Sequence, residues 1–191
     1  MLRLRDGDDG AFAELVQRNT PKVHGLVFRF LGDPQAVDDL TQEVFLRIYR
    51  TAGKYQPAAK FSTWMYRIVA NLAFNVLRAR RKGHAVPLEV SDAREGETFF
   101  ADVRDEKTHA PHQRMADDEL QGQVARAVAE LPENQKIAII LNKYEDKSYD
   151  DIAEVLDCTV MAVKSLLSRA RENLRASLAK YVEDKGTGTR D

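Results

Sequence analysis

Hydrophobic residues recur every three or four positions along most of the chain, which is the spacing of an α-helix with one buried face. In the N-terminal part this pattern predicts four helices, around residues 12–16, 21–30, 37–48 and 62–81. The second should begin at Pro21, because Thr20 can cap it and proline is favoured in the first helical position. It should end at Gly32-Asp33-Pro34, which cannot continue a helix. Ser62 is the expected cap of the fourth.

The same spacing returns near Met115 and predicts four more helices, the first two around residues 115–130 and 137–144. Ser148 can cap the third, a short helix, with Asp151 three residues on as its capping-box partner. A tight turn follows at Asp157, a residue type that tolerates the left-handed conformation. Thr159 then caps a long last helix. No strand pattern is found in the sequence.

Between the two sets of helices the periodicity fails, from Gly83 to about Pro111. This stretch holds seven acidic and three basic residues, a net charge of about −4, which is typical of a flexible linker. We therefore predict an all-α protein with two small helical domains joined by an acidic linker. The expected boundaries are 1–82 and 113–182 for the domains, 83–112 for the linker and 183–191 for a disordered tail.

Composition narrows the classes of function. The 191 residues carry a formal net charge of −1, so any affinity for nucleic acid must come from how the basic residues are distributed. The single cysteine, Cys158, cannot form an internal disulfide, and no apolar run approaches the roughly 18 residues of a membrane span. We expect a cytoplasmic protein without membrane insertion. Because no phosphate-binding loop, nucleophile elbow or metal-binding carboxylate pair occurs, we expect no enzymatic activity, catalytic residue, metal or cofactor.

The strongest functional signal runs from Ser148 to Arg175, where a short capped helix, a turn and a second capped helix form the pattern of a helix-turn-helix. One face of the second helix is apolar. The other carries hydroxyl and basic side chains, namely Lys164, Ser165, Ser168, Arg169, Arg171 and Arg175. Side chains near the start of a recognition helix reach base edges and later ones reach phosphates, so this face predicts binding to duplex DNA. The simpler alternative is a solvated basic face on an ordinary helical hairpin.

A second cluster combines aromatic, asparagine and basic side chains between residues 61 and 82. Its members are Phe61, Trp64, Arg67, Asn71, Asn75, Arg78, Arg80 and Arg81. Aromatic rings beside a basic surface suit unstacked single-stranded bases, and asparagine side chains can read base edges. For Trp64 taken alone, a place in the hydrophobic core is the more economical interpretation.

Taken together, these segments resemble the extracytoplasmic-function sigma factors of the sigma-70 family. Residues 38–45 (DDLTQEVF) and 61–68 (FSTWMYRI) are similar to region 2 of that family. The segments similar to its region 4 are residues 131–133, 148–153 (SYDDIA) and 163–171. The two blocks come in the family's order with its linker between them, and they cover roughly residues 10–82 and 113–181.

The resemblance implies a dissociable specificity subunit of bacterial RNA polymerase, which recognises promoters and helps to melt them while the polymerase does the chemistry. Its implied partners are core RNA polymerase, through the β′ clamp helices and the β flap, promoter DNA, and an anti-sigma factor. The residues implied to bind the polymerase are Asp38, Asp39, Gln42, Glu43 and Arg47.

The resemblance also divides the DNA contacts between two promoter elements. The loop from Gly53 to Phe61, with Lys60, would hold a flipped base of the −10 element, and the cluster on the fourth helix would contact the same strand. The basic face of the last helix would read the −35 element in the major groove. Leu166 stands where many family members carry an arginine, which removes a forked donor for guanine and leaves the preferred −35 sequence open.

Two other classes of function stay open on the residues alone. A one-component transcription regulator would bind duplex DNA without a polymerase, but the cluster at residues 61–82 suits single strands instead. An enzyme that uses a helix-turn-helix to find DNA, such as a recombinase, would need a catalytic set that the sequence lacks. A purely structural module would leave both basic faces without a purpose.

Overall fold

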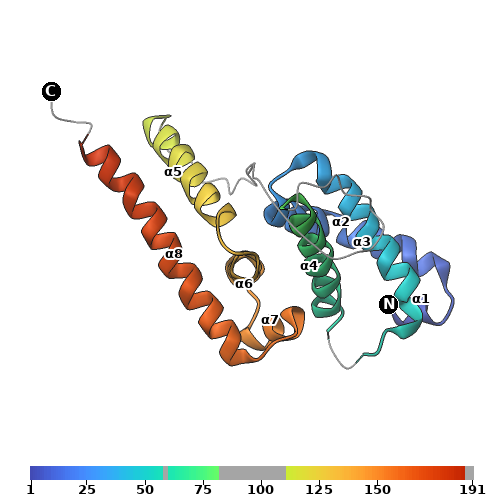
Figure 1. The fold of residues 1–191 in the computed structure, drawn as a ribbon. Coiled ribbons are helices and arrows are strands. Elements are labelled where there is room, and N and C mark those ends of the chain that lie inside the picture. The colour runs from blue at the N-terminus through green and yellow to red at the C-terminus, as the bar shows by residue number, and fades with distance from the viewer. Residues whose placement is uncertain (58–59, 82–110, 188–191) are drawn as a thin grey trace.

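The computed structural model describes residues 1–57, 60–81 and 111–187, which form helices and no strand (Figure 1). The elements are α1 (Leu2–Arg5), α2 (Asp9–Leu31), α3 (Pro34–Thr51), the short 3₁₀ helix η1 (Ala52–Lys54), α4 (Phe61–Arg80), α5 (Pro111–Ala129), α6 (Glu133–Lys143), α7 (Tyr149–Leu156) and α8 (Val160–Thr187). The predicted all-α class is confirmed. In the described ranges no helix is long and apolar enough to cross a membrane.

The predicted linker and tail belong only in part to the described residues. Of the linker, residues 83–110 lie outside the described residues, and α5 begins at Pro111. Helix α8 continues to Thr187, so residues 183–187 of the expected tail are helical. The rest of that tail, residues 188–191, lies outside the described residues.

Helices α2, α3 and α4 pack around an apolar core in the N-terminal half. Val23 and Val27 of α2, Val44 and Ile48 of α3, and Val69 of α4 are all fully buried. The four-residue spacing within each pair is the apolar stripe that the sequence pattern predicts for an amphipathic helix. Burial of these stripes therefore fixes which face of α3 and which face of α4 remain available for binding.

The connection between α2 and α3 follows the sequence prediction. Gly32 ends α2 in the left-handed conformation with φ 66°, which glycine adopts without a steric cost. The side chain of Asp33 then caps α3 by accepting a hydrogen bond from the backbone N–H of Gln35 at 2.9 Å. Pro34 occupies the first turn, where its missing N–H costs nothing.

One predicted helix start is wrong. Helix α2 is continuous from Asp9 to Leu31 and contains Pro21, where two separate helices were expected. The hydroxyl of Thr20 does not cap a new helix but donates to the carbonyl of Val16 at 2.7 Å. Buried residues on both sides of the proline belong to the same helix, so tertiary packing outweighs the loss of one backbone hydrogen bond.

The start of α4 also differs from the prediction. The helix begins at Phe61, so Ser62 lies in its first turn and is not the cap. Lys60 holds the capping position and makes no side-chain hydrogen bond to the first turn. The first turn of α4 therefore lacks the usual side-chain acceptor.

Helices α7 and α8 form the predicted helix-turn-helix in the C-terminal half, and α5 and α6 pack against α8. The Ser148 side chain accepts from the N–H of Asp151 at 3.1 Å and donates to its carboxylate at 2.8 Å, as expected of a capping box. Asp157 takes the left-handed conformation with φ 51° in the turn. Thr159 accepts a hydrogen bond from the N–H of Ala162 at 3.2 Å and so fixes the start of α8.

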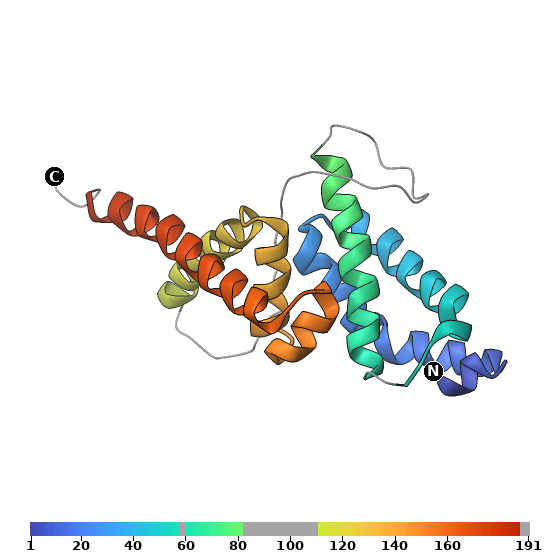
Figure 2. The same cartoon turned by 60° about the horizontal axis from the view of Figure 1, so that its bottom comes forward.

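The two halves pack against each other, mainly through α4 and α7, which lie side by side in both views (Figures 1 and 2). Buried apolar side chains of both halves belong to one continuous cluster. The long helix α8 leads away from this contact toward the C-terminus. Its outer face therefore remains open in this arrangement.

Candidate nucleic-acid interfaces

Helix α8 separates a buried face from a polar one. Val163, Leu167 and Ala170 are fully buried and anchor the helix to the C-terminal core. Lys164 and Ser165 point away from this core and are exposed. Of the other predicted DNA-binding residues on the helix, three are also exposed, namely Ser168, Arg169 and Arg175. Arg171 is half-buried. The structure thus places all six predicted residues on one helix, five of them exposed and Arg171 half-buried.

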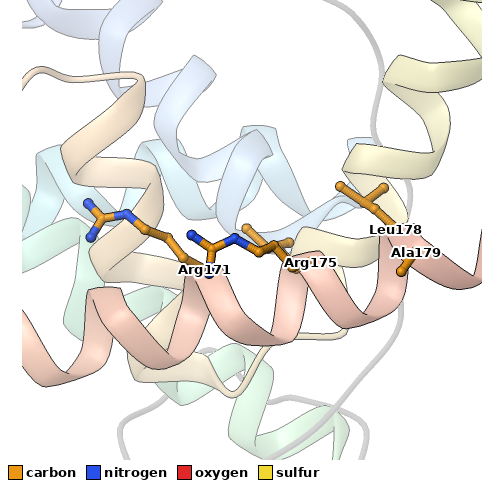
Figure 3. A pocket seen from close by; sticks show the side chains of 5 residues that line it. Arg171, Arg175, Leu178 and Ala179 are labelled. Atoms are coloured by element: carbon orange, nitrogen blue, oxygen red, sulfur yellow. The ribbon is translucent and has the colours of Figure 1, made fainter.

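The later part of α8 has a shallow hollow of about 390 Å³, shown in Figure 3. Its walls are Arg171, Leu174, Arg175, Leu178 and Ala179. The two arginine side chains extend along the helix toward its N-terminal end. Both arginines follow Lys164 by about two to three helical turns, at positions suited to phosphates rather than to bases.

Met161, in the first turn of α8, was not predicted to be a functional residue. Its side chain is 80% exposed. It shares a face with Ser165 and Ser168, because residues four and seven positions apart line up on a helix. An apolar residue in a polar stripe gives no signal of its own in a search for charged clusters, and its exposure is known only from the structure.

Helix α4 presents the second predicted cluster along one face. Arg67 and Asn71 are exposed and Asn75 is half-buried, and the four-residue spacing places them in a single row. Arg78 is half-buried further along the helix. The opposite face of α4 holds Val69 in the core, so the row of polar side chains is fixed by packing behind it.

Three aromatic rings gather at the start of α4. The ring centre of Trp64 lies 5.2 Å from that of Tyr55 and 6.1 Å from that of Phe61, and the Tyr55 and Phe61 rings are 6.4 Å apart. Tyr55 is buried, whereas Phe61 and Trp64 are half-buried. Trp64 therefore both packs internally and keeps part of its surface accessible.

Three of the predicted basic contacts are engaged within the protein. Arg80 forms an ion pair with Asp33 at the start of α3. Lys60 lies 3.9 Å from the Asp151 carboxylate, and Arg81 is paired with a carboxylate of the C-terminal half, Glu133, at 3.8 Å. Lys60 and Arg81 thus contribute to the contact between the two halves in this arrangement.

The predicted polymerase-binding residues of α3 fall into two groups. Asp38, Asp39 and Gln42 are exposed. Glu43 is 7% exposed, and its carboxylate pairs with Arg47 at 3.4 Å. Glu43 therefore supports the surface from inside rather than forming part of it.

Two exposed apolar residues on α3 were not anticipated. Leu46 is 46% exposed and Tyr49 is 47% exposed. Together with Asp39 and Gln42 they follow a spacing of three, four and three residues, which places all four on one face. These two apolar side chains extend the exposed face that carries the predicted polymerase-binding residues.

The contact between the halves includes a buried polar centre. The Tyr66 hydroxyl on α4 donates to the Glu145 carboxylate at 2.7 Å, and Tyr66 is fully buried. Lys22 and Arg29 of α2 approach the same carboxylate at 3.7 and 3.9 Å, and the Lys147 ammonium lies 4.9 Å from the Tyr66 ring centre. Burial, followed by the hydrogen bond to Glu145, raises the pKa of Tyr66.

Each half of the chain matches a known protein-family model. Residues 15–83 match the family model described as sigma-70 region 2, and residues 121–174 match the one described as sigma-70, region 4. The matched ranges contain α4 with its polar row and the helix-turn-helix with its basic face. The two matches come in the order expected from the sequence, with region 2 before region 4.

Similar proteins match over most of their length. The chain is 37% identical to the RNA polymerase sigma-H factor of Pseudomonas aeruginosa, over 92% of this chain and 90% of that protein. It is 38% identical to the ECF RNA polymerase sigma-E factor of Escherichia coli K12, over 89% of this chain and 87% of that protein. The likeness therefore includes both halves.

Solved structures show the same fold. The sigma factor RpoE of Bartonella quintana, in complex with the anti-sigma factor NepR, matches with a TM-score of 0.61 and 19% identity, covering 88% of this chain and 97% of that one. CnrH, in complex with the cytosolic domain of CnrY, matches with a TM-score of 0.63 and 23% identity, covering 94% of each chain.

Proposed function

This chain belongs to the extracytoplasmic-function sigma factors of the sigma-70 family, and from that premise we propose how its surfaces divide the work of promoter recognition. As a member of that family it is an alternative sigma factor for transcription initiation and is not itself an enzyme. Core RNA polymerase and promoter DNA are its proposed partners, and the cytoplasm, where the polymerase works, is its proposed location.

The solvent face of α8 reads the −35 element as a duplex. Lys164 and Ser165 lie near the start of the helix, where recognition helices approach base edges in the major groove. Arg171 and Arg175 lie further along and contact phosphates. The observation that carries this proposal is the separation of the helix into an apolar face, on which Val163, Leu167 and Ala170 are fully buried, and a mainly polar face that is exposed.

The row on α4 and the aromatic cluster at its start bind the separated −10 strand. Unstacked bases gain free energy by stacking on aromatic rings, and the accessible parts of Phe61 and Trp64 supply such surfaces. Arg67, Asn71 and Asn75 then follow the strand along one helix face. Duplex DNA offers no unstacked bases, so this surface favours the melted form of the promoter.

The exposed face of α3 binds core RNA polymerase. Asp38, Asp39 and Gln42 supply polar contacts, and Arg47 is held in place by the buried Glu43. The half-exposed Leu46 adds an apolar anchor to this face. The family resemblance names the β′ clamp helices as the binding surface.

Promoter binding requires the two halves to separate. Elements named for positions −10 and −35 lie about 25 base pairs apart, which is about 85 Å of duplex at 3.4 Å per base pair. In the arrangement described above, which we call closed, α4 and α7 are in direct contact. The two DNA-binding surfaces therefore cannot both reach their elements. We further propose an anti-sigma factor as a partner of the closed or free protein, by analogy with the complexes of RpoE and CnrH.

Binding of holoenzyme to promoter fragments with separable parts tests the assignment. The fragment has a duplex −35 element and a single-stranded −10 element, and either part can be replaced by an unrelated sequence. Lys164→Ala should weaken binding only when the −35 duplex is intact, and Asn71→Ala only when the −10 strand is intact. If both variants respond to the same element, the proposed division of labour is wrong.

A further inference from the structure

We propose that Met161 is a specificity-determining residue that recognises the C5-methyl group of a thymine in the −35 element. The proposal rests on the proposed −35 role of α8, and it specifies which chemical group one side chain of that helix recognises. Its starting point is an apolar side chain that is 80% exposed on an otherwise polar DNA-binding face. Among the described residues, the next most exposed large hydrophobic side chain is that of Tyr144, at 52%.

The position of Met161 is fixed by the start of the helix. The Thr159 hydroxyl accepts from the N–H of Ala162 at 3.2 Å, and the carbonyl of Thr159 accepts from the N–H of Val163 at 3.1 Å. Val163 is fully buried. The backbone of this turn is therefore anchored on both sides of Met161, and the side chain is held at the end of the helix that enters a major groove first.

Packing does not account for this side chain. Val160 and Leu166 are partly buried against the core, and Val163 is part of it, whereas Met161 belongs to neither group. The contact with the N-terminal half does not cover it either, since Met161 is exposed with that half in place. An exposed apolar residue that serves neither contact is available for a partner that approaches this face.

The major groove offers one apolar group on its base edges, the C5-methyl of thymine. The neighbouring Lys164 is suited to a different group, because it can only donate hydrogen bonds and so favours guanine. The unbranched thioether of methionine is flexible enough to follow the position of a methyl group. Leu166 cannot take this role, because it is partly buried against the core.

Substitution of thymine by deoxyuridine tests the contact, since it removes only the methyl group. The −35 element is first selected by holoenzyme from a randomised pool, and each thymine in it is then replaced in turn. Binding of wild-type holoenzyme should fall about threefold to fivefold at one thymine, the size expected for one methyl group in an apolar contact. Met161→Ala holoenzyme should bind the thymine and uracil forms of that site equally.

A matched control uses Lys164→Ala, three residues away on the same helix. This variant should bind all sites more weakly but keep the full difference between thymine and uracil. If no thymine shows a methyl effect that Met161→Ala abolishes, the inference is overturned while the −35 role of α8 stands. If replacing the whole −35 element leaves binding unchanged, the −35 role fails and the inference fails with it.

Discussion

The hydroxyl of Tyr66 donates a 2.7 Å hydrogen bond to the carboxylate of Glu145 and thereby joins α4 to the loop before α7. Both groups are removed from solvent, with Tyr66 fully buried and the Glu145 side chain 9% exposed. Lys22 and Arg29 lie around the same carboxylate. A buried acid with three partners, all from the other half of the chain, makes this contact sensitive to a single substitution.

Glu145→Ala should open the two halves. A hydrogen bond to a charged group contributes about 1.5–3 kcal/mol, so the closed population should fall about tenfold or more relative to the open one. Energy transfer between dyes on cysteines placed at Gln35 and Arg126, in a Cys158→Ser background, reports the separation. Glu154→Ala removes an exposed acid from α7 and serves as the control. Equal transfer in the Glu145→Ala and Glu154→Ala proteins would contradict the prediction.

The capping box of α7 makes a pH-dependent contribution to stability. The Ser148 hydroxyl is the main cause that lowers the pKa of Asp151 below its ordinary value of 3.8, with Lys60 and Thr63 adding to it. Because the folded-state pKa is lowered, the stabilisation is present above pH 3.8 and disappears as the pH falls through the lowered pKa. Ser148→Ala should cost about 1 kcal/mol at neutral pH.

Asp151→Asn provides the matching measurement. Its deficit in free energy of unfolding relative to the wild type, measured by urea denaturation, should be largest at neutral pH and should shrink below pH 3.8. A deficit that is the same at neutral pH and about one pH unit below that value would mean that the charge of Asp151 is not what stabilises the helix.

Arg169→Ala should weaken binding of holoenzyme to −35 duplex DNA and make it less dependent on salt. Arg169 is exposed on the polar face of α8, and removing one contact to a phosphate reduces the slope of log affinity against log salt by about one. Titrations at several salt concentrations give this slope directly. Arg126→Ala, which removes an exposed arginine from α5, should leave it unchanged.

Leu46→Asp should reduce binding to core polymerase by about tenfold or more, because it places a charge at an apolar anchor. Glu43→Gln should act differently, since Glu43 is buried and pairs with Arg47 and Arg50. It should lower the melting temperature of the free protein as well as the affinity. Fluorescence titration with core polymerase, combined with thermal melts, separates the two effects, and a Leu46→Asp protein that binds normally would exclude this face as the docking surface.

The sequence correctly predicted those helix boundaries that are set by interactions within a few residues. Gly32, Ser148 and Asp157 end or begin helices where expected, because their side chains or backbone conformations act within a few residues. Pro21 misled the prediction, because the packing of α2 against the rest of the bundle overrides a local helix-breaking signal. The same limit explains Ser62, which has the chemistry of a cap but lies inside the first turn of the helix.

The exposed polar faces of α8 and α4 were predictable, because charge or a motif marks them in the sequence. Burial of Glu43 could not be predicted from the sequence, because it depends on how tightly α3 packs. The pairing of Tyr66 with Glu145 joins residues from separate halves, and no local pattern connects them. Met161 was missed because an apolar residue becomes informative only once its exposure is known.

The most direct test of the account is transcription by purified core RNA polymerase on a pool of promoter fragments, with and without this protein. We predict that a defined set of transcripts appears only when the protein is added, and that their start sites share two upstream elements, one near −35 and one near −10. The opposite result, with no selected transcript but tight binding of the free protein to a duplex site, would contradict the account and favour a one-component regulator.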